Sequence, residues 1–76
     1  MTTTLLLCNL PHLVTYVEIF RLFRETMYEP VGMMVYPHTG IAFVDIEHAD
    51  YCQTLLDQAL LLGRKISVLP LTEAVE

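Results

Sequence analysis

Short apolar runs, separated by prolines and glycines, divide the chain into a series of short elements. Residues 4–9 form one such run, and residues 31–36 and 41–46 form two more. Their length and their content of β-branched side chains predict strands. The tight turn at residues 37–40 then predicts an antiparallel hairpin between the second and third runs. A fourth strand is expected at residues 64–69, where apolar side chains alternate along the segment.

Two other segments carry apolar residues at helical spacing. The first begins at Thr15, which stands three residues before Glu18 and so forms the pair typical of a capping box. It is expected to continue to about residue 27, because Pro30 bars further helix. The second helix is expected at residues 48–60, with Gly63 placed to end it or to begin a turn.

The order of these elements is β-α-β-β-α-β. Right-handed connections then predict an α+β, ferredoxin-like sandwich, with a four-stranded antiparallel sheet and two helices on one face. We expect one domain over residues 1–76, with its core at residues 4–71 and a tail at 72–76, excised from a larger protein. The opposite face of the sheet has no remaining chain to cover it, so function is expected there or on the outer helix surfaces.

The composition supports a folded domain with apolar surface to spare. Of the 76 residues, 54% are hydrophobic, which excludes intrinsic disorder. A domain of this size buries only about 60% of its unfolded-chain surface, so apolar patches should remain exposed and mark partner sites. No purely apolar run exceeds the length of residues 59–62, far short of the ~20 residues of a membrane span. Two cysteines inside apolar segments predict free thiols and an intracellular setting.

Three local strings carry a family resemblance. Residues 5–10 read LLLCNL, residues 39–46 read TGIAFVDI, and residues 63–68 read GRKISV. In this order and at these spacings they resemble the hexamer, the octamer and the entry to the last strand of the RNA recognition motif (RRM) family. The resemblance covers about residues 4–71.

The resemblance implies binding of single-stranded RNA on the open sheet face, where bases stack on aromatic side chains. The three stacking positions are Leu6, Ile41 and Phe43, and only Phe43 is aromatic. Thr39 stands where the family carries a basic residue, so counterion release should contribute little affinity. We therefore expect weak binding, with a preference for pyrimidine-rich RNA because small bases suit an aliphatic face. The predicted RNA-binding residues are Phe43, Ile41, Leu6, Asn9, Thr39, His38, Lys65 and Arg64.

A second interpretation is a module for protein–protein interaction or self-association that has kept the fold but binds little RNA. Its support is the apolar excess together with a formal charge of −5. The residues expected to contact protein are Tyr16, Phe20, Met33 and Val35. The register of residues 31–36 stays open, because either Met33 and Val35 or Met34 and Tyr36 could lie on the open face.

No catalytic constellation is found. The spacings of the three histidines and two cysteines match no zinc pattern, and isolated glycines form no phosphate-binding loop. We expect no enzymatic activity, no cofactor, no metal, no membrane partner and no small-molecule substrate. The resemblance favours an RNA-processing protein of mRNA metabolism, in the nucleus by base rate, with cytoplasm and mitochondrion as alternatives.

Overall fold

The computed structural model describes residues 2–71, and the predicted tail at residues 72–76 lies outside them. The elements in chain order are β1 (Thr2–Cys8), α1 (Tyr16–Phe23), the 3₁₀ turn η1 (Arg24–Thr26), β2 (Gly32–Tyr36), β3 (Ile41–Glu47), α2 (Ala49–Leu56), β4 (Leu60–Leu61), β5 (Arg64–Lys65) and β6 (Ser67–Pro70).

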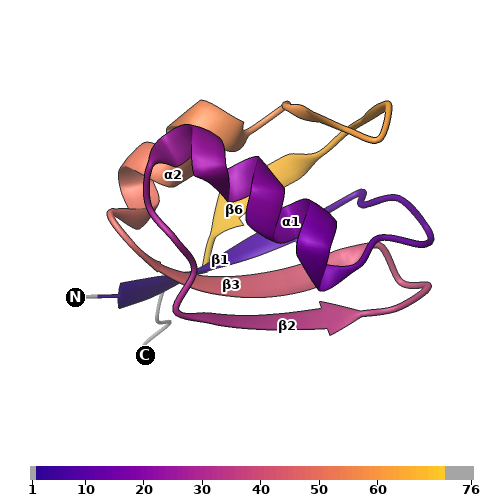
Figure 1. The fold of residues 1–76 in the computed structure, drawn as a ribbon, viewed down its shortest axis with the longest axis horizontal. Helices are drawn as coiled ribbons and strands as arrows, with labels where there is room; N and C mark the ends of the chain where they lie inside the picture. Colours follow the sequence, from indigo (N-terminus) through magenta and orange to yellow (C-terminus); the bar gives the residue numbers. More distant parts are fainter. Residues whose placement is uncertain (1, 72–76) are drawn as a thin grey trace.

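Four strands form one antiparallel sheet in the order β2-β3-β1-β6, and both helices lie on the same face of it (Figure 1). The predicted fold class is confirmed. Within residues 2–71, no helix covers the other face of the sheet. β2 and β6 are the edge strands of this sheet.

The core lies between the helices and the sheet, and alternation along the strands decides which side chains enter it. Leu5 and Leu7 of β1 are fully buried, whereas Leu6 between them is only half-buried on the open face. The same alternation holds in β3. The buried apolar cluster comprises Leu5, Leu7, Leu10, Val14, Ile19, Leu22, Phe23, Ala42, Val44, Ile46, Ala49, Cys52, Leu56, Leu61, Ile66 and Val68.

Helix α1 starts where the capping box was predicted. The backbone N–H of Thr15 donates to the Glu18 carboxylate at 2.7 Å, and the Thr15 hydroxyl bonds the same oxygen. These bonds hold the pKa of Glu18 below its ordinary value, because they favour the ionised carboxylate.

The first helix ends earlier than predicted because a buried hydroxyl forms hydrogen bonds with backbone groups that a further helical turn would have paired. Thr26 is 1% exposed; its Oγ1 donates to the Phe23 carbonyl at 2.7 Å and accepts from the Tyr28 N–H at 3.1 Å. Met27 then takes a left-handed conformation, with φ 71°. The α-helix therefore stops at Phe23, and Arg24–Thr26 form a 3₁₀ turn instead of the predicted helical continuation.

The prediction of one strand over residues 64–69 is wrong. The chain forms a small hairpin in which β4 pairs with β5, and only then enters the main sheet as β6. Its turn residues, Leu62 and Gly63, both have positive φ, at 51° and 83°. Buried Ile66 separates the two pieces and bonds back to the chain after α2, its N–H donating to the Ala59 carbonyl at 2.9 Å. The second helix accordingly ends at Leu56 rather than at residue 60.

Candidate nucleic-acid interface

One row of side chains crosses the open face of the sheet from edge to edge. Register pairs Met34 of β2 with Phe43 of β3, Phe43 with Leu6 of β1, and Leu6 with Leu69 of β6. Phe43 thus lies on the second strand from the β2 edge, flanked by a thioether and an isobutyl group. The predicted positions Leu6, Ile41 and Phe43 all lie on this face, as their alternation required.

A second aromatic ring joins Phe43 on this face. Tyr36 of β2 pairs with Ile41, and its ring meets that of Phe43 edge-to-face, with centroids 5.8 Å apart and planes at 90°. Tyr36 is 44% exposed, so its ring is accessible. The family positions alone indicated a single ring; the structure shows two. The signal that could have found Tyr36 is the tight turn, which forces Tyr36 and Ile41 opposite each other.

The pairing of β2 with β3 also decides which side chains of residues 31–36 lie on the open face. Met34 and Tyr36 lie on the open face, and Met33 and Val35 pack against the core on the helix side. The alternative that put Met33 and Val35 on the open face is therefore wrong. Sequence pattern could not decide it, because side chains on both faces of this strand are apolar.

Polar candidates gather beyond the end of β1 and the start of β3. Asn9, His38, Thr39 and Arg64 line one hollow of about 230 Å³, together with Leu10, His12 and Gly40. The two imidazoles contact each other, with His38 Nδ1 2.9 Å from His12 Nε2. This cluster places hydrogen-bonding groups next to the apolar row, at one end of the sheet.

Asn9, Thr39 and Arg64 already form hydrogen bonds that stabilise the fold. Arg64 donates from Nε to the Asn9 carbonyl at 3.2 Å and from Nη2 to Asn9 Oδ1 at 2.9 Å, while Asn9 Nδ2 donates to the Lys65 carbonyl at 2.8 Å. The Thr39 hydroxyl donates to the Tyr36 carbonyl at 2.7 Å inside the hairpin turn. These bonds hold the β4–β5 hairpin against the loop after β1 and fix the guanidinium at the edge of the hollow.

The charges on this surface are unevenly placed. Arg64 and Lys65 lie at the end of the sheet that carries the hollow. Asp45 lies on the open face toward the other end of β3, opposite Gly32 of β2, and accepts a hydrogen bond from the Thr4 hydroxyl. A polyanion would therefore be favoured at the Arg64 end and repelled at the Asp45 end.

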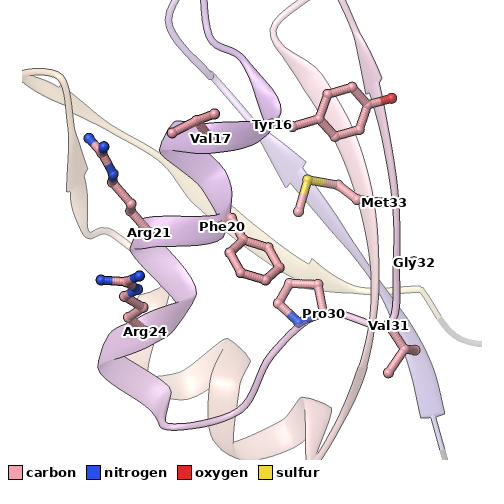
Figure 2. Close-up of a pocket in the computed structure, with 9 residues that line it drawn as sticks. All are labelled: Tyr16, Val17, Phe20, Arg21, Arg24, Pro30, Val31, Gly32 and Met33. Carbon is pink, nitrogen blue, oxygen red and sulfur yellow. The ribbon is translucent and has the colours of Figure 1, made fainter.

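The residues predicted to contact protein divide between two places. Tyr16, Phe20 and Met33 line one groove between α1 and β2, where Figure 2 shows them on facing walls. Val35 is not among its lining residues and packs against the core.

Residues 2–71 contain no group of three or more histidine, cysteine or acidic side chains placed to hold a metal ion. Within the same range, no helix is long and apolar enough to cross a membrane. Cys8 and Cys52 are free thiols, the first half-buried and the second buried.

Comparisons with known proteins agree on the architecture. No family model and no curated protein sequence matches the chain. Among solved structures, it is similar to the RBD of Nop6 from S. cerevisiae, with a TM-score of 0.77, 23% identity, and coverage of 96% of this chain and 98% of that one. It is also similar to the second RNA recognition motif of RNA-binding protein 19, with a TM-score of 0.71, 22% identity, and coverage of 92% and 82%. The chain therefore has the fold of the RNA recognition motif.

Proposed function

We propose that this domain binds single-stranded RNA across the open face of its sheet. The observation that carries the proposal is a pair of rings, half-buried Phe43 and exposed Tyr36, set beside the apolar row on the face that no helix covers within residues 2–71. The similarity in fold to the second RNA recognition motif of RNA-binding protein 19 supports the same proposal.

Each part of the surface has a role that its chemistry suits. Phe43 stacks one base, and Tyr36, held edge-on to it, offers a second ring to a neighbouring base. Leu6, Ile41 and Met34 make apolar contacts beside them. Stacking contributes about 1–3 kcal/mol per base, so two rings supply roughly 2–6 kcal/mol.

Electrostatics add little to this binding. Arg64 and Lys65 are two of only four basic residues in the chain and lie at the end of the sheet, with His38 nearby to bond a base or phosphate. Each neutralised phosphate contributes through counterion release, so two cations give a modest effect. The proposed affinity is therefore weak for an isolated domain, with pyrimidines preferred because small bases fit between aliphatic side chains.

An amide NMR titration tests this proposal. The ¹⁵N-labelled domain is titrated with an octamer of uridine and, separately, with an octamer of adenosine. The proposal predicts shifts at the open-face positions of β1, β2 and β3, with tighter binding of the uridine octamer. Absence of shifts with both RNAs, or shifts confined to the helices, would contradict it.

Self-association is a second candidate, favoured by the row Met34, Phe43, Leu6 and Leu69, which is largely aliphatic and continuous over all four strands. A second copy could cover this row. Sedimentation over a range of concentrations tests it: a dimer that RNA dissociates would place the interface on the sheet face, and a monomer at every concentration would exclude it.

A further inference from the structure

A groove runs between α1 and the edge strand β2, on the helix side of the sheet and away from the open face. Its volume is about 610 Å³, and it is lined by Tyr16, Val17, Phe20, Arg21, Arg24, Pro30, Val31, Gly32 and Met33. In Figure 2, Phe20 and Pro30 face each other across it, and Met33 lies beside Tyr16. Most of the lining is apolar or aromatic, and this part of the molecule takes no part in the proposed RNA contact.

The apolar side chains that line the groove remain exposed, because other residues of α1 fill the core. Phe20 is 39% exposed, Tyr16 52% and Val31 67%, so three large side chains of one groove stay in contact with water. Residues 19, 22 and 23 already fill the buried face of α1, and the core does not need Tyr16 or Phe20. Contiguous exposed apolar side chains of this kind mark interaction sites.

The rim of the groove carries half of the chain's positive charge. Arg21 and Arg24 are two of only four basic residues, in a chain with formal charge −5. Arg21 lies on the last turn of α1 and Arg24, three positions later, begins η1 with a helical backbone, so their Cβ atoms are about 5–6 Å apart. Both residues belong to the lining of the groove, and Figure 2 shows their side chains leaving the helix on the side away from β2.

Neither arginine is neutralised by a close partner. Within residues 2–71, no ion pair is formed by Arg21 or Arg24. Arg21 lowers the pKa of Glu18 slightly, but that carboxylate is held by Thr15 at the helix start. Two cations on the border of an apolar groove are therefore available to a partner.

We propose that this groove binds a peptide segment of a partner protein that carries large apolar side chains flanked by carboxylates. The apolar side chains would enter between Phe20, Pro30 and Met33, and the carboxylates would meet the two guanidinium groups, which bind carboxylate in forked pairs. RNA is the less favoured occupant, because two arginines offer few contacts to a continuous phosphate backbone, which depends on many cations for its affinity.

Selection from a random 12-residue peptide display library tests the proposal on the intact chain. The expected consensus has one or two large apolar residues flanked by Asp or Glu. Failure to obtain a consensus, or a consensus without acidic residues, would overturn the proposal. Selected sequences are then synthesised and their affinities measured against variants.

Two matched pairs of variants locate the site. Arg21→Glu should lower the affinity for the peptide about fivefold or more. Lys65→Glu, which makes the same change of charge on the β4–β5 hairpin, should leave that affinity unchanged. Phe20→Ala should weaken it about tenfold or more, as for an interface anchor, while Tyr51→Ala, which removes an exposed ring of α2, should not. Equal losses within either pair would overturn the proposal.

The uridine octamer separates this result from the function proposed above. Peptide and RNA should bind together, and Arg21→Glu should lower RNA affinity far less than peptide affinity. If the octamer displaces the peptide, or if both affinities fall alike, the groove is part of a nucleic-acid surface and the peptide proposal fails. If the peptide binds and RNA does not, only the RNA proposal fails.

Discussion

Replacing Thr26 by valine removes one hydroxyl from the connection between α1 and β2 while keeping the shape of the side chain. Thr26 is 1% exposed, and its hydroxyl bonds two backbone groups, the Phe23 carbonyl at 2.7 Å and the Tyr28 N–H at 3.1 Å. Each lost hydrogen bond costs about 1 kcal/mol, and leaving the partners unpaired in a buried place raises the cost to about 1–3 kcal/mol each. Burial of the added methyl group offsets about 1 kcal/mol.

The expected net loss is therefore roughly 1–5 kcal/mol in the free energy of unfolding, which corresponds to a fall in Tm of about 4 °C or more for a domain of this size. Urea denaturation should show a lower midpoint with the slope unchanged. Thr54→Val on the exposed side of α2 is the control and should change stability by less than about 0.5 kcal/mol. A loss below about 0.5 kcal/mol for Thr26→Val would refute the idea that this hydroxyl ends the helix.

Three further predictions concern the hairpin, the helix cap and the salt dependence. Leu62→Asn should stabilise the domain by about 1 kcal/mol, because Leu62 is exposed with φ 51° and asparagine tolerates that conformation better; thermal unfolding measures it, and a lower Tm would contradict it. Thr15→Ala should lower the Tm at pH 7. Because the pKa of Glu18 lies below 4.5 in the folded state, the stabilisation by its carboxylate is present above pH 4.5 and is lost as the pH falls through the folded pKa. The Tm difference between the wild type and Thr15→Ala should therefore narrow in acid, and a constant difference would show that the bond between the Thr15 hydroxyl and Glu18 contributes nothing. For the uridine octamer, the plot of log affinity against log salt should have a slope of about −1.4 for two phosphate contacts, falling to about −0.7 in Lys65→Gln; a slope steeper than about −3 would mean that more cations take part.

Much of the fold could be predicted because its signals are local. The cap at Thr15 and the alternation that buries Leu5 and Leu7 depend on residues a few positions apart, and the structure confirms both. The end of the first helix was missed because the Thr26 hydroxyl acts only once it is buried. The hairpin at residues 60–65 was missed because its turn places leucine, a poor residue for positive φ, at position 62.

The candidate site was predicted less completely. Leu6, Ile41 and Phe43 follow from alternation, whereas Tyr36 required the register of a strand that is apolar on both faces. The engagement of Asn9 by Arg64 joins residues 55 positions apart, and no local pattern indicates such a contact. The predicted contacts of the open-face residues and of Asn9 and Arg64 with RNA stay predictions.

The affinity of Phe43→Ala for the uridine octamer, measured by fluorescence anisotropy, tests the central claim most directly. Loss of one stacking platform worth about 1–3 kcal/mol predicts a fall of roughly 5- to 150-fold. Phe43→Leu, which keeps apolar bulk without the ring, should lose most of the same affinity. Phe20→Ala, in the groove between α1 and β2, should bind the octamer as the wild type does. Unchanged RNA affinity in a folded Phe43→Ala variant would contradict the account.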